Sequence, residues 1–171
     1  RIRAGNIGHE AGRLAANAEL GNVWSYDIPA KQNSAKAKAL DPEQNSSVLG
    51  YDANIHGTGN WADLEGADVL IVNAGIPRKP GQSRDDLVAS NLPIIRDVAQ
   101  SAKKYCPDAF AIVISNPLDA MVSAYKRVTG RPNEKVEGVA GGPGSDRFPL
   151  CLVRAARGGA RDARRAACGG P

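Results

Sequence analysis

The sequence predicts an α/β fold built on one open, parallel sheet, and three observations support this. Short apolar runs alternate along the chain with longer amphipathic stretches, which is the pattern of strands and helices in a parallel sheet. The 171 residues suffice for one domain with a full core, since single domains commonly have about 100–200 residues. No internal repeat and no inter-domain linker is visible. We therefore expect a doubly wound α/β domain.

Four apolar runs are expected to be strands. They are rich in β-branched and aromatic residues, as buried strands are. The runs cover residues 23–27 (VWSYD), 68–73 (DVLIVN), 110–115 (FAIVIS) and, as a shorter candidate, 136–140.

Three stretches between these runs are expected to be helices. Pro117 suits the first turn of the last one, and Lys103 and Lys104 suit the C-terminus of the longest. The longest helix also keeps four apolar residues roughly on one face, namely Leu87, Ile94, Val98 and Ala102. The three stretches cover residues 10–19, 85–104 and 117–129.

A glycine pattern at the N-terminus, RIRAGNIGHEAG, predicts a dinucleotide site. Gly5 and Gly8 stand where the second and third glycines of a G-x-G-x-x-G turn fall, before a helix and a strand that ends at Asp27. Gly5 would let the backbone approach a pyrophosphate, and Asp27 would accept hydrogen bonds from ribose hydroxyls. Arg3 replaces the first glycine, and the strand before it has only one or two residues. Because Asp27 would also repel a 2′-phosphate, the pattern favours NAD over NADP.

Two arginines share a loop bounded by glycine and proline after the second long apolar run, in the stretch NAGIPRKPGQSRDDL. Arg78 and Arg84 each carry a planar guanidinium that can pair with a carboxylate in bidentate fashion. Pro77, Pro80 and Gly81 keep the segment between them non-helical. Such a loop can clamp a dicarboxylate, although a solvated basic loop fits the same spacing.

The net charge of +4 is concentrated at the C-terminus. Residues 154–171 hold five arginines and one aspartate, so the rest of the chain is neutral. A nucleic-acid binder would spread positive charge over a face and interleave aromatic residues, so no nucleic-acid partner is expected. The tail RAARGGARDARRAACGG has no large apolar residue, and we expect it to be poorly ordered.

Cysteine usage and hydropathy favour a cytoplasmic protein with no membrane partner. No apolar run approaches the roughly 18 residues of a membrane helix, and no charged-then-apolar leader is visible. Cys106, Cys151 and Cys168 are far apart and form no C-x-x-C pair, so neither a disulfide framework nor a metal site is expected.

From Gly5 to about Phe148 the chain resembles, without gaps, the cofactor-binding half of the NAD-dependent malate dehydrogenases in the lactate/malate dehydrogenase family. The strings that carry the resemblance are DLEGADVLIVNAGIPRKPGQSRDDL, KKYCPDAFAIVISNPLDAM and EGVAG. It implies a Rossmann NAD-binding domain over residues 1–141, truncated in its first strand. Residues 142–171 would then begin a substrate domain and end in the degenerate tail, so that the chain is a fragment.

The resemblance implies a role for several residues of this chain in binding malate or oxaloacetate. Arg78 resembles the arginine that binds the far carboxylate, and Arg84 the mobile-loop arginine that polarises the substrate carbonyl. Asn116 resembles the asparagine that hydrogen-bonds the substrate oxygen, and Arg147 the arginine that holds the carboxylate next to the reacting carbon. Two carboxylates need two cationic anchors, and a developing alkoxide needs a donor, so the chemistry agrees.

The resemblance also implies which residues contact the cofactor, which metabolic reaction the parent enzyme catalyses, and that this enzyme is an oligomer. Ala74, Gly75 and Asn116 would approach NAD, and Ile114 would lie near the nicotinamide. The reaction would be the malate step of the tricarboxylic acid cycle, and the parent enzyme would be a homo-oligomer.

The family's acid–base pair is missing from this sequence. The aspartate position is Gly144, and the histidine position is about Pro171. Asp146 would be rotated about 200° from position 144 on a helix, so it is no replacement. His9 and His56, the latter near a short strand candidate, are expected to be local structural residues. The abrupt departure after residue 141, biased to Ala, Arg, Gly and Pro, suggests a reading-frame error in GC-rich coding sequence.

Three functional interpretations remain open from the sequence. The first is a malate dehydrogenase whose fragment has little or no turnover by itself. The second is a lactate or other 2-hydroxy acid dehydrogenase, against which Arg78 argues. The third is a non-catalytic NAD-binding module or pseudoenzyme, which Gly144 and Pro171 favour.

Overall fold

The computed structural model describes residues 2–3, 6–50 and 54–139. The chain divides into two compact units, Arg1–Gly138 and Val139–Pro171. The helices and strands described belong to the first unit.

The first unit contains six parallel strands, arranged as two half-sheets. The first half-sheet has the order β1 (Ile2–Arg3), β2 (Val23–Tyr26), β3 (Ile55–Thr58). The second has the order β4 (Val69–Val72), β5 (Phe110–Val113), β6 (Val136–Gly138). The register pairs Val23 with Ile55 in the first and Val72 with Val113 in the second. Because β1 also contacts β4, the strands follow the order 3-2-1-4-5-6 of a doubly wound α/β fold, as predicted.

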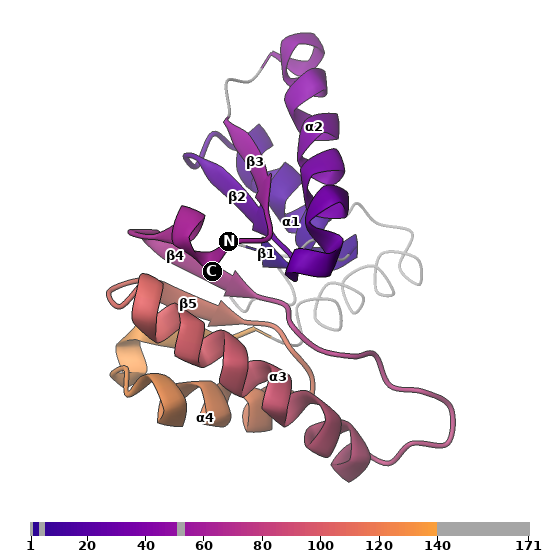
Figure 1. Ribbon diagram of the computed structural model, residues 1–171, viewed down its shortest axis with the longest axis vertical. Helices are drawn as coiled ribbons and strands as arrows, with labels where there is room; N and C mark the ends of the chain where they lie inside the picture. The colour runs from indigo at the N-terminus through magenta and orange to yellow at the C-terminus, as the bar shows by residue number, and fades with distance from the viewer. Residues whose placement is uncertain (1, 4–5, 51–53, 140–171) are drawn as a thin grey trace, which may run out of the picture. The chain divides into compact units, whose positions relative to one another are not determined.

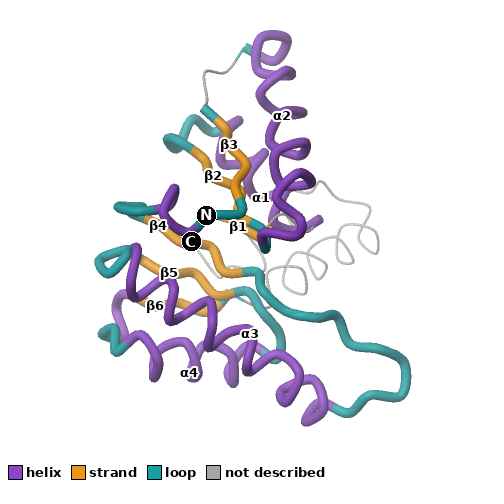
Figure 2. Tube along the Cα trace, in the orientation of Figure 1, coloured by secondary structure: helices purple, strands orange, loops and turns teal. Residues whose placement is uncertain are grey.

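Each half-sheet has its own pair of helices (Figures 1 and 2). Helices α1 (Asn6–Asn17) and α2 (Gln32–Leu49) pack with the first half-sheet. Helices α3 (Arg84–Tyr105) and α4 (Leu118–Thr129) pack against each other beside the second. Short 3₁₀ helices occupy three connections, at Pro29–Lys31, Trp61–Leu64 and Asn133–Lys135.

The predicted elements are confirmed, with shifted ends. Each predicted strand is one or two residues shorter than its apolar run, and the two later helices begin and end within one residue of expectation. The first helix was placed too late, since α1 begins at Asn6 rather than at residue 10. The first strand has two residues, as the sequence suggested.

Helix α2 was not predicted. Its described buried residues are Ala35, Ala39 and Pro42, so the segment shows no periodic pattern of large apolar residues. It packs on β3 through Gly57, where a Cβ atom would lie 2.3 Å from the carbonyl oxygen of Ala35. Only a glycine allows this contact between helix and strand.

The buried face of α3 also differs from the prediction. The side chains that are fully covered are Leu87, Asn91, Ile95, Ala99 and Ala102. Ile94 and Val98, which were assigned to this face, are only partly buried. The buried stripe advances by four residues from Leu87 to Ala99 and by three to Ala102, and it includes a polar residue, Asn91, among apolar ones.

Arg131 joins the C-terminal ends of α3 and α4. Its Nη1 donates to the carbonyl oxygen of Ala109 at 2.8 Å and to the Tyr125 hydroxyl at 3.3 Å. Its Nη2 donates to the carbonyl oxygens of Ala102, at 3.3 Å, and Cys106. Tyr125 is fully buried, and burial raises the pKa of its hydroxyl to about 12. A cation at the carbonyl end of a helix also complements the helix dipole.

Candidate functional site

A cavity of about 960 Å³ opens where β2, β4 and β5 end. The carboxyl ends of parallel strands at the point where strand order reverses are the usual ligand site of this architecture. Its wall brings together seven of the residues singled out from the sequence: Asp27, Ala74, Gly75, Arg78, Arg84, Ile114 and Asn116. These residues are up to 89 positions apart in the chain, and the topology alone makes them neighbours.

The charge of this wall suits an anionic ligand. Within the described lining, Lys31, Lys38, Arg78 and Arg84 are cationic, and Asp27 is the single acid. A concave surface dominated by one sign of charge concentrates ligands of the opposite sign.

Asp27 follows the last residue of β2 and is 4% exposed. Its Oδ1 accepts a hydrogen bond from the Ile28 backbone N–H at 2.9 Å, and its own N–H donates to the Thr58 carbonyl oxygen at 3.1 Å. The second bond continues the pairing of β2 with β3 by one residue. The carboxylate is therefore fixed at the end of the strand, where it can accept hydrogen bonds from a ligand's hydroxyls.

The segment after β4 approaches the cavity closely with its backbone. Ala74 is buried, and Gly75 has a φ of 156°. A Cβ atom on Gly75 would lie 3.2–3.3 Å from the side-chain amide of Asn91, so a larger residue would be both strained and crowded. Ile114 donates from its backbone N–H to the Val72 carbonyl oxygen at 2.9 Å, which extends the pairing of β4 with β5 to the cavity edge.

A loop projects from the end of β4 before α3 begins (Figure 1). Arg78 lies on this loop, and Arg84 is the first residue of α3. Arg78 is exposed, and its Nε donates to the Gln82 carbonyl oxygen at 2.8 Å. The Gln82 side-chain oxygen accepts from the Lys79 backbone N–H at 2.9 Å. These two bonds fold the loop onto itself while the terminal nitrogens of Arg78 can still form a bidentate pair.

A capping box fixes the position of Arg84, the first residue of α3. The Ser83 hydroxyl accepts from the Asp86 backbone N–H at 3.0 Å, and the Asp86 carboxylate accepts from the Ser83 backbone N–H at 2.9 Å. Hydrogen bonds from the backbone and side chain of Ser83 lower the pKa of Asp86 below its usual 3.8. The helix start is thus specified by its own side chains, and Arg84 is held at the cavity wall.

Asn116 is exposed at the cavity, and its backbone is held from behind by Asn91. Asn91 was missed by the sequence reasoning. The available signal was a polar residue at i, i+4 spacing between Leu87 and Ile95 on the buried side of α3, since a buried amide must find partners.

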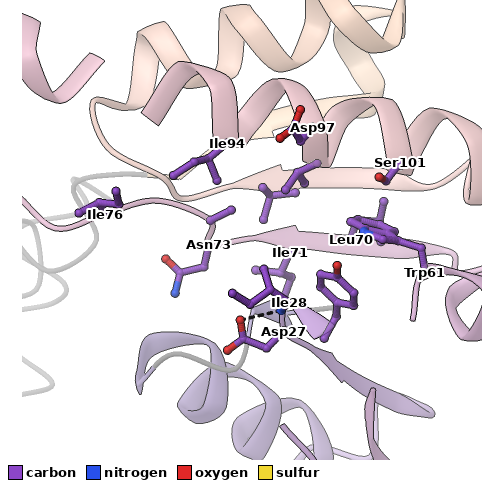
Figure 3. A pocket seen from close by; sticks show the side chains of 15 residues that line it. Asp27, Ile28, Trp61, Leu70, Ile71, Asn73, Ile76, Ile94, Asp97 and Ser101 are labelled. Atoms are coloured by element: carbon purple, nitrogen blue, oxygen red, sulfur yellow. Dashed lines mark hydrogen bonds between the residues drawn. The ribbon is translucent and has the colours of Figure 1, made fainter. Parts of the chain in front are cut away.

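A second, mainly apolar pocket of about 420 Å³ adjoins Asp27. Figure 3 shows Asp27 and Ile28 on one side of it and Ile94 and Ser101 of α3 on the other. Ile94 and Val98 therefore line a pocket instead of filling the core. A mainly apolar pocket next to a buried carboxylate has the lining that a flat heteroaromatic ring would require.

Several predicted positions are not on this described wall. Gly8 is buried in the first turn of α1, while Ile7 of the same turn lines the cavity. His56 is exposed on β3 and stacks on Trp24, with ring centroids 4.7 Å apart. His9 is half-buried in α1. Outside the described residues lie Gly5, Gly144, Arg147 and Pro171.

Two features of the described residues bear on other functions. None of the helices in residues 2–3, 6–50 and 54–139 combines the length and apolarity that a bilayer span requires. The same residues contain no group of three or more His, Cys, Asp or Glu side chains placed to hold a metal ion.

Comparisons with known proteins agree with this geometry. Residues 3–138 match the family model for the lactate/malate dehydrogenase, NAD binding domain. The malate dehydrogenase of Sorangium cellulosum (strain So ce56) is 62% identical over 169 residues, which make up 99% of this chain and 54% of that protein. The chain spans about half the length of the curated relatives it matches.

Solved structures of malate and lactate dehydrogenases superpose well on this chain. The crystal structure of Cryptosporidium parvum malate dehydrogenase matches with a TM-score of 0.87 and 41% identity, covering 94% of this chain and 51% of that one. The structure of the lactate dehydrogenase from the same organism, complexed with lactic acid and nicotinamide adenine dinucleotide, matches with a TM-score of 0.86 and 37% identity. It covers 94% of this chain and 50% of that chain.

Proposed function

The chain belongs to the lactate/malate dehydrogenase family, and on that premise we propose that it is the cofactor-binding part of a malate dehydrogenase. The reaction is hydride transfer between malate and NAD, which gives oxaloacetate and NADH. The observation that carries this proposal is one cavity whose described wall includes most of the candidates. They are the cofactor candidates Asp27, Ala74, Gly75 and Ile114 and the substrate candidates Arg78, Arg84 and Asn116.

The residues present fit NAD. Asp27 offers a buried carboxylate at the end of β2 for the ribose hydroxyls, and the apolar pocket beside it accepts the adenine ring. Gly75 and Ala74 let the cofactor approach the backbone after β4, and Ile114 borders the nicotinamide. Gly5 and Gly8 serve the pyrophosphate at the start of α1. When bound, the nicotinamide supplies the position that accepts or returns the hydride.

The substrate side of the cavity is built for a dicarboxylate. Arg78 pairs with the carboxylate far from the reacting carbon. Arg147 lies outside the described residues, and its role with the near carboxylate is proposed from the family resemblance alone. Arg84 and Asn116 donate hydrogen bonds to the substrate oxygen, where negative charge develops. A monocarboxylate such as lactate would leave Arg78 without its partner, which is why malate is the preferred substrate.

The acid–base pair of the reaction is not supplied by this chain. Its family positions correspond to Gly144 and about Pro171, and neither glycine nor proline can carry a proton. We therefore expect the 171-residue chain to bind NADH and to show little or no turnover. A separately supplied C-terminal half could restore activity.

The remaining expectations complete the proposal. Residues 1–141 form the NAD-binding domain and residues 142–171 begin the substrate domain. The parent enzyme is a cytoplasmic homo-oligomer that serves the malate step of the tricarboxylic acid cycle.

A second candidate is a non-catalytic NAD-binding module, which the missing acid–base pair favours. A third is a lactate or other 2-hydroxy acid dehydrogenase, which is supported by the match to the structure of a lactate dehydrogenase. Arg78 separates the third candidate from the first, because only a dicarboxylate uses it.

The test is a fluorescence titration of the purified chain with NADH, followed by addition of oxaloacetate alone and then with the C-terminal half of a relative. NADH binding and oxidation only in the presence of that half would support the dehydrogenase. Binding that never leads to oxidation would favour the non-catalytic module. In the restored enzyme, Arg78→Gln should shift preference from oxaloacetate toward pyruvate, and no shift would count against malate as the substrate.

A further inference from the structure

Asn91 is a buried polar side chain that connects two segments of the cavity wall. It is 1% exposed and lies between Leu87 and Ile95 on the face of α3 that packs into the core. A buried amide without partners is strongly unfavourable, so its presence among apolar neighbours requires hydrogen bonds that compensate it.

Those hydrogen bonds all reach backbone groups of the site. The Oδ1 atom of Asn91 accepts from the Ile76 N–H at 2.7 Å, and its Nδ2 donates to the Ile76 carbonyl oxygen at 3.3 Å. The same Nδ2 donates to the Asn116 carbonyl oxygen at 2.8 Å. The paired bonds to Ile76 set the orientation of the amide, because the oxygen must face an N–H and the nitrogen a carbonyl.

The two partners belong to different parts of the proposed site. Ile76 comes two residues before Arg78, at the root of the arginine loop, whereas Asn116 itself faces the cavity. Gly75 allows the approach, since any Cβ there would lie 3.2–3.3 Å from the Asn91 amide. A single side chain of α3 therefore connects the loop proposed to bind the far carboxylate with the residue proposed to bind the oxygen on the reacting carbon.

We propose that Asn91 is a positioning residue that sets the distance between the arginine loop and Asn116, and thereby selects dicarboxylates by the distance between their far carboxylate and the oxygen on the reacting carbon. This inference rests on the proposed function, because it takes the ligand to be malate or oxaloacetate. Asn91 touches neither substrate nor cofactor and acts through Ile76 and Asn116. A misplacement of about 1 Å can lower a reaction rate about a hundredfold, so the spacing of two substrate anchors is tightly constrained.

The test compares Asn91→Asp with the unaltered 171-residue chain. Aspartate keeps the shape and the acceptor for the Ile76 N–H but loses both donated hydrogen bonds, including the one to Asn116. Binding is measured with NADH by fluorescence, and then with malate added to the NADH complex by nuclear magnetic resonance at millimolar concentrations. NADH and malate cannot exchange a hydride, so the measurement does not depend on turnover.

We expect the substitution to change the dissociation constant of malate but not that of NADH. The NADH dissociation constant should stay within about twofold, while the malate dissociation constant should rise about tenfold or more. Ser90→Ala is the matched control, since the Ser90 hydroxyl donates to the Asp86 carbonyl oxygen within α3 itself. A merely structural role would weaken both ligands together, and this result would overturn the proposal.

A second variant covers the case in which aspartate prevents folding. Asn91→Ser leaves room for a water molecule in place of the amide and should show the same difference between the two ligands. If neither variant folds, or if both bind malate as tightly as the unaltered chain, Asn91 is not a positioning residue. If the unaltered chain binds NADH but not malate, the proposed function fails first, and the inference falls with it.

Discussion

The two half-sheets of the first unit share a topology but differ in how they are held together. The second buries a continuous cluster of 14 residues between β4–β6, α3 and α4. Among the described side chains, the cluster of the first half-sheet has four, namely Ala16, Val23, Ala39 and Ile55. Three large apolar side chains of the same region, Ile7, Leu14 and Leu20, are more than half exposed. Within the described residues, buried apolar packing is therefore concentrated on the side that carries the arginine loop.

This difference in packing parallels the proposed roles of the two half-sheets in binding the cofactor and the substrate. The first half-sheet contributes Asp27 on the cofactor side, whereas the second contributes Arg78, Arg84 and Asn116 on the substrate side. Substrate anchors must hold a small molecule to within a fraction of an ångström, and they are attached to the better-packed core.

The largest expected effect is on the core itself. Ile95→Ala should lower the free energy of unfolding by about 4 kcal/mol, because Ile95 is fully buried in the larger cluster. Ile55→Ala should lower it by about 2 kcal/mol, since Ile55 packs in the smaller one. Urea denaturation of both variants measures the difference. Equal losses would show that the two half-sheets are equally well packed.

The next effect concerns Arg131, which satisfies several carbonyl oxygens at the end of α3. Arg131→Met should destabilise the domain by about 2–3 kcal/mol, because the charged hydrogen bonds are lost and buried carbonyls remain. Arg127→Met, an exposed arginine in the last turn of α4, is the control and should change stability by less than about 0.5 kcal/mol. Amide exchange should locate the loss in the second half-sheet, and a loss in the first would contradict this account.

A smaller effect is expected from a substitution at Asp27, which should change the affinity for the nucleotide but not the affinity for malate. Asp27→Ser removes a negative charge from a wall that also includes Lys31, so NADPH should gain about tenfold in affinity relative to NADH. Malate binding to the nucleotide complex should stay unchanged. Fluorescence titrations with both nucleotides test this, and a variant that still rejects NADPH would remove Asp27 from the cofactor site.

The smallest effect is a pH dependence at the start of α3. The pKa of Asp86 is lowered in the folded chain, so its contribution is fully present above its unfolded value of 3.8 and is lost as the pH falls through the folded value. The first turn of α3, including Arg84, should therefore loosen below about pH 4. Amide resonances of this turn followed from pH 5 downward, at about half-unit steps, would reveal it. The step should be absent in Asp86→Asn.

Much of the fold could be predicted because several of its buried strands are unbroken apolar runs in the sequence. DVLIVN and FAIVIS are strands by composition alone, and they became the central strands β4 and β5. Helix α2 could not be predicted, since Ala35 and Ala39 carry no periodic signal and the glycine that accommodates them, Gly57, is distant in sequence.

The candidate site was predictable to a similar extent. Arg78 and Arg84 could be found because proline and glycine mark their loop, and Asp27 because its distance from the glycine turn is characteristic. Asn91 could not, because its partners are 15 and 25 residues away. The sequence places Ile94 and Val98 on one apolar face with Leu87 and Ala102, because the residues of a pocket wall and of a core face have the same apolar spacing.

The self-bonded loop around Arg78 has a consequence for how a small ligand can be held. Ordering the backbone of one residue opposes binding by about 1–2 kcal/mol, and a dicarboxylate of about nine non-hydrogen atoms has little interaction energy to offset this. Because Gln82 already ties Arg78 and Lys79 together, that entropy is lost when the chain folds and not when the ligand arrives. The binding free energy of the carboxylate is then hardly reduced by ordering of the loop. It can therefore favour a dicarboxylate strongly over a ligand that lacks this charged group.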